Sequence, residues 1–259
     1  MHLIWKKSIY NYERKKCGPK ETGKEPLIEA ICELRFKSDK DSISDLLPGL
    51  IFQKLSVRFP KVEKLPASNI PTAVLKSDPN LRYTPTIKLI GDQFSIMIGE
   101  NVFSLSCSKP YVGWNNFSAL VMELFSILNE TSLITHSERV SLKYIDILSD
   151  KDKFMLDDLN LKFEIGGDRI TTEPVQLKCE LKTDKFIDII HIGYPAEAVL
   201  NNGQTFHGIL IDVDTISLIM PKDLLIDPKD FLDCAHVINK SRFFNLLKAE
   251  TIKRLDPEY

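Results

Sequence analysis

The clearest pattern along the chain is a one-sided apolar face over residues 117–128. Its apolar side chains recur at the three- and four-residue spacing of an α-helix, whereas Ser118 and Glu123 lie off that face. The residues of the face are Phe117, Leu120, Val121, Leu124, Phe125 and Leu128. Asn115 or Asn116 can accept hydrogen bonds from the free N–H groups of the first turn. The pattern predicts an amphipathic helix that lies on an apolar sheet.

A second clear pattern is the alternation over residues 28–36. The apolar positions are Ile28, Ala30, Cys32, Leu34 and Phe36, and Glu29, Glu33 and Arg35 are among the residues between them. A period of two with one charged face is typical of a half-exposed strand, and it fixes the register because a one-residue slip would bury the charges. The charged row either lines a site or forms a solvated sheet face with cross-strand charge pairs.

The elements around these two segments predict the fold of residues 26–150. A helix is predicted over residues 42–59, and strands over residues 86–90, 94–98, 102–107 and 139–148. Prolines interrupt residues 60–85, and a connection of this length is either flexible or functional. The order of elements resembles a ferredoxin-like βαββαβ unit with an additional hairpin strand.

Residues 151–259 predict a second half of similar construction. Strands are predicted over residues 161–165, 175–183, 186–194 and 205–218, and Asp227-Pro228 is a favourable N-cap and first residue for a helix from Lys229 towards Leu247. Short turns between strands favour antiparallel pairing. The sequence therefore predicts an α+β protein with a basic extension (residues 1–25) and two halves (26–150 and 151–259), each an antiparallel sheet with helices on one face.

Composition narrows the classes of protein without indicating an activity. The chain has 259 residues, of which 43% are hydrophobic and 27% charged, with a formal net charge of −2. This balance gives no global electrostatic reason to bind nucleic acid or an anionic membrane. No apolar run approaches the roughly 20 residues that span a bilayer, and the N-terminus lacks the apolar core of a signal peptide. Five scattered cysteines form no CxxC pair, so we expect a cytoplasmic protein without disulfides, zinc or another cofactor.

The first 25 residues are locally basic, with seven Lys/Arg against three Glu. One interpretation is an arm that contacts phosphate or an acidic partner. The other is a terminal extension without a binding role.

The segment PLIEAICELRF at residues 26–36 resembles the opening of a sporadically distributed, uncharacterised family of prokaryotic proteins. The matching residues are Pro26, Glu29, Glu33, Arg35 and Phe36. Further agreement comes from Tyr111 with Gly113-Trp114, from the strand over residues 139–146, from Ile211 to Asp214, and from the terminal helix around His236 to Phe243. The resemblance covers about residues 26–256. It implies a cytoplasmic α+β protein, transfers no catalytic residue, and through its sporadic distribution suggests an accessory role in a bacterial defence or mobile-element system.

Motifs for catalysis or phosphate binding are absent from the sequence, including Walker A, GxGxxG, HExxH, GxSxG and EF-hand patterns. The sharpest alternative is carboxylate chemistry. Asp212 and Asp214 share a strand face about 7 Å apart, and Asp146 ends another strand. If they converge, oxygen ligands of this kind suit Mg²⁺ or Mn²⁺ and metal-dependent phosphoester hydrolysis. On wet sheet faces, however, the D-x-D pattern also occurs without a metal.

An aromatic and basic group offers a third interpretation. Trp114 and Tyr144, with Arg139, can form a stacking surface for bases or for another ligand. Equally, Trp114 can pack onto the first turn of the long helix as a hydrophobic staple.

The leading prediction is a non-enzymatic interaction or ligand-sensing module, with a protein as the expected partner and no membrane. Homo-oligomers are consistent with the exposed edges of antiparallel sheets. The alternatives are the metal-dependent hydrolase and a nucleic-acid-binding protein that acts through the basic N-terminal segment.

Overall fold

The computed structural model describes residues 19, 21–40, 42–200, 202–218 and 224–258. The chain forms two compact units, each assembled from separated stretches of sequence. Unit 1 comprises residues 1–30, 142–216 and 233–259, and unit 2 comprises residues 31–141 and 217–232. The units are interleaved along the chain, whereas the sequence predicts consecutive halves over 26–150 and 151–259. Most of the predicted basic extension, residues 1–25, lies outside the described residues.

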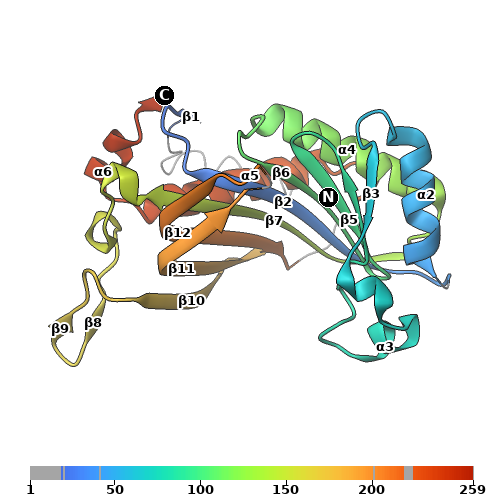
Figure 1. The fold of residues 1–259 in the computed structure, drawn as a ribbon, viewed down its shortest axis with the longest axis horizontal. Helices are drawn as coiled ribbons and strands as arrows, with labels where there is room; N and C mark the ends of the chain where they lie inside the picture. Colours follow the sequence, from blue (N-terminus) through green and yellow to red (C-terminus); the bar gives the residue numbers. More distant parts are fainter. Residues whose placement is uncertain (1–18, 20, 41, 201, 219–223, 259) are drawn as a thin grey trace. The chain divides into compact units, whose positions relative to one another are not determined.

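Unit 2 contains an antiparallel run of short strands together with helices from both of its stretches of sequence, including the first residues of α5 (Lys229–Asn245). Its elements are β2 (Leu27–Lys37, of which residues 31–37 belong here), α2 (Ile43–Leu55), β3 (Lys61–Lys64), the 3₁₀-helix η1 (Pro66–Asn69), α3 (Thr72–Ser77), β4 (Ile87–Ile90), β5 (Phe94–Ile98), β6 (Val102–Ser108), α4 (Trp114–Thr131) and the first residues of β7 (His136–Ser149). The strands follow the order β2-β6-β5-β4-β3, and β3 to β6 pair antiparallel with their neighbours (Figure 1).

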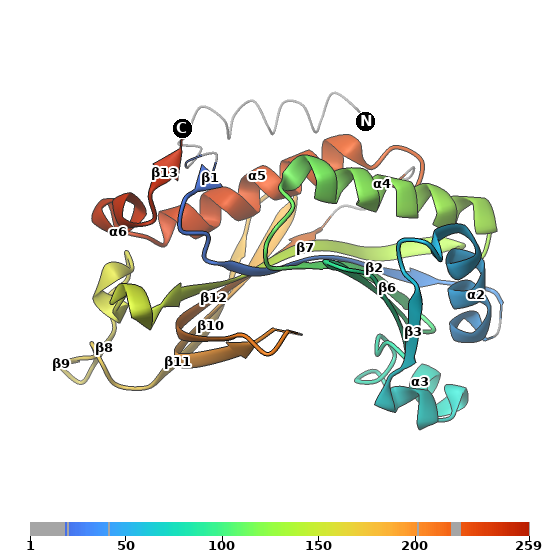
Figure 2. The same ribbon diagram turned by 45° about the horizontal axis from the view of Figure 1, so that its top comes forward.

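The alternation in β2 has the predicted effect on burial. Every even position from Ile28 to Phe36 is buried, and every odd position from Glu29 to Arg35 is half-buried. The predicted apolar face of α4 is also confirmed, because all six of its residues are buried, and Figure 2 shows α4 along one face of β2 and β6. The helix begins at Trp114 rather than after an asparagine cap. Gly113 precedes it with φ 82°, a left-handed conformation that favours glycine.

The proline-rich region over residues 60–85 contains more regular structure than its sequence indicates. It holds β3, η1 and α3, and β3 pairs with β4 along four residues from Lys61↔Ile90 to Lys64↔Ile87. All four residues of β3 are exposed. Pro60 directly precedes β3, Pro66 is the first residue of η1, and Pro71 directly precedes α3. At these positions no ladder or helical hydrogen bond is needed from the proline nitrogen.

Unit 1 holds the longer strands and the C-terminal helices. Its elements are β1 (Glu21–Thr22), the first residues of β2, the remainder of β7, the 3₁₀-helices η2 (Asp150–Asp152) and η3 (Leu156–Asp158), β8 (Glu164–Ile165), β9 (Asp168–Arg169), β10 (Val175–Lys182), β11 (Phe186–Val199), β12 (Thr205–Ser217, of which residues 205–216 belong here), α5 (Lys229–Asn245, of which residues 233–245 belong here), α6 (Ala249–Arg254) and β13 (Pro257–Glu258). The sheet order is β10-β11-β12-β7, and β10 pairs antiparallel with β11.

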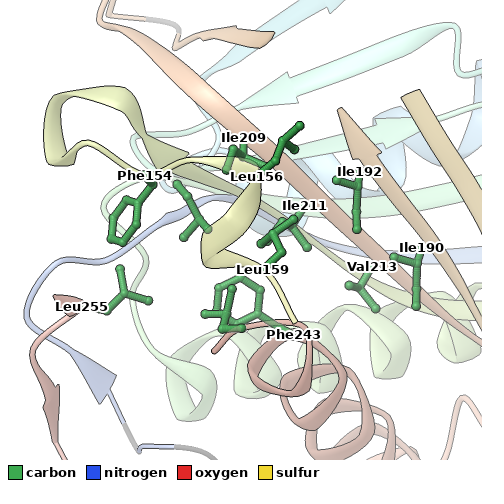
Figure 3. Close-up of a cluster of buried hydrophobic side chains, with 12 residues drawn as sticks. Phe154, Leu156, Leu159, Ile190, Ile192, Ile209, Ile211, Val213, Phe243 and Leu255 are labelled. Carbon is green, nitrogen blue, oxygen red and sulfur yellow. The ribbon is translucent and has the colours of Figure 1, made fainter. Parts of the chain in front are cut away.

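Helix α5 is held on the unit 1 sheet by a buried amide. The Nδ2 group of Asn239 donates to the carbonyl oxygen of Leu142 in β7 at 3.0 Å and to that of Val213 in β12 at 2.8 Å. Further along the helix, Phe243 joins a buried cluster with the strand residues Ile190, Ile211 and Val213 (Figure 3). The helix therefore combines apolar packing with two hydrogen bonds to neighbouring strands.

The first and last described strands close unit 1. Strand β1 pairs antiparallel with β13 through Glu21↔Glu258 and Thr22↔Pro257. The N–H of Gly23 donates to the carbonyl oxygen of Asp256 at 2.8 Å. Lys24 adds an ion pair to Asp152 at 2.8 Å.

The α+β class and the antiparallel pairing of the strands are confirmed. The finer description of residues 26–150 as ferredoxin-like stays a prediction. Among the described residues, no helix has both the length and the apolar character needed to cross a membrane.

Candidate functional site

A group of polar and cation–π contacts lies on a half-exposed surface of unit 2. We call it the arginine–tyrosine cluster, and it consists of Glu33, Arg35, Lys37, Arg82, Tyr83 and Glu138. The first three follow one another at odd positions of β2, so they share the face of the strand that its buried core residues do not occupy. Arg82 and Tyr83 come from the segment between α3 and β4, and Glu138 from β7.

Tyr83 is the centre of the cluster. The guanidinium carbon of Arg35 lies 4.4 Å from the centroid of the tyrosine ring, and that of Arg82 lies 5.3 Å from it. Both distances are within the range of a cation–π contact. The phenol hydroxyl donates to Glu138 at 2.9 Å. The ring thus supports two cations while its hydroxyl contacts a carboxylate.

Glu138 balances part of the positive charge. It accepts from Nη2 of Arg82 at 3.3 Å and pairs with Nζ of Lys37 at 3.3 Å. Burial, and then the hydrogen bond to Glu138, raise the pKa of Tyr83. The hydroxyl is consequently a neutral donor throughout the physiological pH range.

The ion pair of Arg35 occupies only one of its nitrogens. Nε donates to Glu33 at 2.7 Å, and within the described part of the chain neither Nη atom of Arg35 makes a hydrogen bond. The Arg35 side chain is 28% exposed. The cluster as a whole carries three cations against two carboxylates, so its formal charge is one positive. It presents a stacked, partly exposed guanidinium with spare donors.

The three predicted ligand-stacking residues are not all surface groups. Trp114 is half-buried at the start of α4, and its ring centroid lies 6.4 Å from that of Phe117 in a tilted contact. Arg139 is half-buried and follows Glu138 in β7. Tyr144 belongs to unit 1 and is only 6% exposed. Trp114 is the first residue of α4 and contacts Phe117 within the first turn of the same helix.

Tyr144 takes part in a buried polar contact beneath α5. Its hydroxyl shares a hydrogen bond of 2.7 Å with Nδ1 of His236, and the two rings meet edge to face with centroids 5.8 Å apart. Burial, and then the charge of Lys240, lower the pKa of His236 to about 3, whereas Asp233 acts in the opposite direction. The imidazole is therefore neutral at physiological pH. This neutral pair of a buried tyrosine and a half-buried histidine joins α5 to β7.

The predicted metal-binding carboxylates are distributed over the two faces of the unit 1 sheet. Asp212 pairs with Lys143 at 3.3 Å, so these two side chains share one face. Tyr144, the next residue, contacts α5 on the other face, and alternation along β7 places Asp146 with Tyr144. Asp214 shares the face of Asp212, because they are two residues apart. The structure does not bring the three carboxylates together.

Other possible metal ligands in the described part of the chain are also dispersed. Among the described residues, no group of three or more His, Cys, Asp or Glu side chains is arranged to hold a metal ion.

A buried ion pair lies on the α5 face of the unit 1 sheet. Asp188, which is completely buried, accepts from Nε of Arg242 at 2.9 Å and from the hydroxyl of Thr215 at 2.9 Å. All three partners come from different elements, β11, α5 and β12. Because both of these contacts of the carboxylate are to neighbouring elements of unit 1, we interpret the group as a support of the fold.

The comparisons with known proteins supply no functional guide. Neither family models, nor curated proteins, nor solved structures gave a match to the chain. The resemblance over residues 26–256 therefore stays a prediction.

Sequence reasoning identified part of the arginine–tyrosine cluster and missed the rest. The charged row of β2 indicated Glu33 and Arg35 as possible members of a site. Arg82 and Tyr83 lie in the proline-rich region, where the sequence left a functional connection open. Glu138 comes directly before the predicted strand over residues 139–148, and nothing in its local pattern marks it. Only the alternation of charges in β2 provided a signal.

Proposed function

We propose that the protein is a non-catalytic binding module and that its arginine–tyrosine cluster recognises an acidic group on a protein partner. The observation that carries the proposal is the Arg35 guanidinium, which is stacked on Tyr83, is 28% exposed, and makes no hydrogen bond through its Nη atoms within the described residues. A planar guanidinium with two spare nitrogens matches a carboxylate in a bidentate geometry.

Preorganisation supports recognition at this position. Tyr83 fixes one face of the guanidinium, and Glu33 fixes Nε, so little side-chain freedom remains to be lost on binding. The excess of one positive charge in the cluster favours an anionic partner. Glu33 and Glu138 simultaneously disfavour a strongly anionic polymer, because they lie beside the cations and repel adjacent phosphates.

The proposal can be tested with labelled acidic peptides as probes. Fluorescence anisotropy would compare the binding of Glu- and Asp-containing hexapeptides with that of matched Gln and Asn peptides, using the wild type and the variant Arg35→Gln. Loss of a bidentate charge-assisted contact corresponds to about 1.5–3 kcal/mol, so Arg35→Gln should weaken binding at least about tenfold.

Lys61→Gln provides the matched control, because it removes the same charge from an exposed strand of the same unit. It should change the affinity less than about twofold. Equal losses in the two variants would show that only net charge attracts the peptide, and the proposal would fail. A single-stranded oligonucleotide of equal charge that binds more tightly than the peptides would favour the nucleic-acid alternative instead.

No specific observation in the described residues favours the hydrolase or the nucleic-acid-binding protein. The hydrolase would need Asp146, Asp212 and Asp214 to converge, and they occupy two faces of the sheet. The nucleic-acid interpretation rests mainly on residues 1–25, most of which lie outside the described residues. We therefore argue only for the binding module.

Several broader expectations remain part of the proposal. They are membership of the uncharacterised prokaryotic family, a cytoplasmic location, an accessory role in a defence or mobile-element system, and a ferredoxin-like arrangement of residues 26–150. The resemblance at Pro26 to Phe36 supports the first three. The last is supported by the order of β2, α2, β5, β6, α4 and β7 along the chain, with β3, η1, α3 and β4 inserted between α2 and β5.

A further inference from the structure

Strand β10 forms an open edge of the unit 1 sheet. It stands at the end of the strand order, and all eight of its residues, Val175 to Lys182, pair with β11 on one side. No described residue hydrogen-bonds to its backbone on the other side. Five of the eight side chains are exposed, including Leu181 at 40%. An edge of this length, with a row of backbone donors and acceptors, is a template for another strand.

The pairing with β11 determines which backbone groups face outward. The N–H of Thr183 donates to the carbonyl oxygen of Phe186 at 2.8 Å, immediately beyond the pair Lys182↔Ile187. Hydrogen-bonded and non-hydrogen-bonded pairs alternate along an antiparallel ladder. The odd residues of β10 therefore bond to β11, and the even residues present their N–H and C=O groups to the open edge.

We propose that β10 pairs antiparallel with β10 of a second copy of this chain, with Cys179 opposite its own counterpart on the two-fold axis. The outward groups belong to even residues, so an added strand must pair even residues with even residues. In a two-fold arrangement this places a residue opposite itself. Only the registers centred on Lys178 and on Cys179 keep most of the strand paired.

Charge selects between these two registers. The register centred on Lys178 places two lysines directly opposite each other, which is destabilising. The register centred on Cys179 places Lys178 opposite Glu180 of the second copy, and by symmetry repeats that pair. It also places Leu177 opposite Leu181, which covers part of an exposed apolar side chain. The strand is thus complementary to itself in a single register.

This self-complementarity identifies a second copy as the occupant rather than an unrelated strand. Strand β3, at the opposite end of the strand order, is a poorer template for an added strand. It has only four residues, and Pro60 directly precedes it. The inference concerns unit 1 and does not depend on the arginine–tyrosine cluster of unit 2.

The first experiment tests the strand pairing by charge reversal. Sedimentation velocity over a concentration series would measure the dimer dissociation constant of the wild type, Lys178→Glu, Glu180→Lys and the double variant. Each single reversal creates like-charge pairs and should weaken the dimer at least about tenfold. The double variant exchanges the partners of each pair and should restore most of the affinity.

Lys162→Glu is the matched control, because it makes the same charge change at an exposed residue outside β10. It should leave the dissociation constant within about twofold of the wild type. Circular dichroism would establish that each variant is folded. A wild type that stays monomeric at about 100 µM would overturn the proposal, as would a dimer that is insensitive to both single reversals. A dimer that the double variant fails to restore would equally exclude this register.

The second experiment tests the register through Cys179. Opposed residues of a non-hydrogen-bonded pair have Cα atoms about 4.5 Å apart, which is within the range of a disulfide. Diamide would oxidise the two thiols, taking up two electrons and two protons as the S–S bond forms. Peptide mass spectrometry should then find Cys179 linked to Cys179, and Cys179→Ser should abolish that dimer. Linkage exclusively through other cysteines would contradict the predicted register.

Discussion

Replacement of His236 by glutamine should reveal a stability contribution that depends on pH. In the folded protein the half-buried imidazole has a pKa lowered to about 3, from an ordinary value of 6.5. Between these two values the unfolded chain binds a proton at His236 that the folded chain does not bind. Stability is therefore complete above pH 6.5 and decreases as the pH falls towards 3.

The size of the effect follows from the difference between the two pKa values. Each pH unit below 6.5 removes about 1.4 kcal/mol, so about 2 kcal/mol is lost at pH 5. Glutamine is polar and does not titrate. The free energy of unfolding of the wild type minus that of His236→Gln should consequently fall by about 2 kcal/mol between pH 7.5 and pH 5. Other titrating groups contribute equally to both proteins and cancel.

Urea denaturation followed by circular dichroism at several pH values would measure this difference. Between pH 7.5 and 8.5 the difference should be constant, which provides an internal control. A difference that stays constant down to pH 5 would refute the argument that burial keeps the imidazole neutral. A difference that grows as the pH falls would show that Asp233 stabilises the imidazolium more than burial and Lys240 destabilise it.

Two further substitutions test the attachment of α5 to its sheet. Asn239→Ala removes both hydrogen bonds to strand carbonyls and should lower the free energy of unfolding by about 2–3 kcal/mol in urea denaturation; a loss below about 0.5 kcal/mol would contradict the bridging role. Arg242→Ala leaves the fully buried Asp188 without its ion-pair partner and should cost about 3–5 kcal/mol. Replacing both Asp188 and Arg242 by apolar residues should cost less than Arg242→Ala alone, and a larger cost would refute the account of an uncompensated buried charge.

Local periodicity accounts for the parts of the fold that the sequence predicted well. The alternation in β2 and the apolar stripe of α4 each depend on residues that are close in sequence, because one face of each element must be buried. The beginning of α5 was also predictable, since Asp227-Pro228 precedes its first residue, Lys229. The start of α4 was not predicted correctly, because the helix begins after Gly113 rather than after an asparagine cap. The backbone conformation of a glycine leaves no signal in the periodicity of the sequence.

The candidate site depends on contacts that local periodicity does not report. Tyr83 and Glu138 are 55 residues apart in sequence and come from different elements. A single sequence shows which side of a strand is polar but gives no strand order or facing partner. For the same reason, the sequence could not show that the three carboxylates of the metal hypothesis lie on two faces of a sheet. Asp146 and Asp212 each end or interrupt an apolar strand pattern, and only the contacts of Lys143 and Tyr144 show which face each occupies.

The short ladder between β1 and β13 has a consequence for the order in which the chain folds. Residues 22 and 257 are paired, so the ladder closes a loop of 257 − 22 = 235 residues. Closing a flexible loop of that length costs about 5 kcal/mol of chain entropy, which two residue pairs do not recover by themselves. The ladder can therefore form only after the intervening chain is already compact. Under mechanical tension applied at the two ends it should be the first contact to open, because the force acts directly on it.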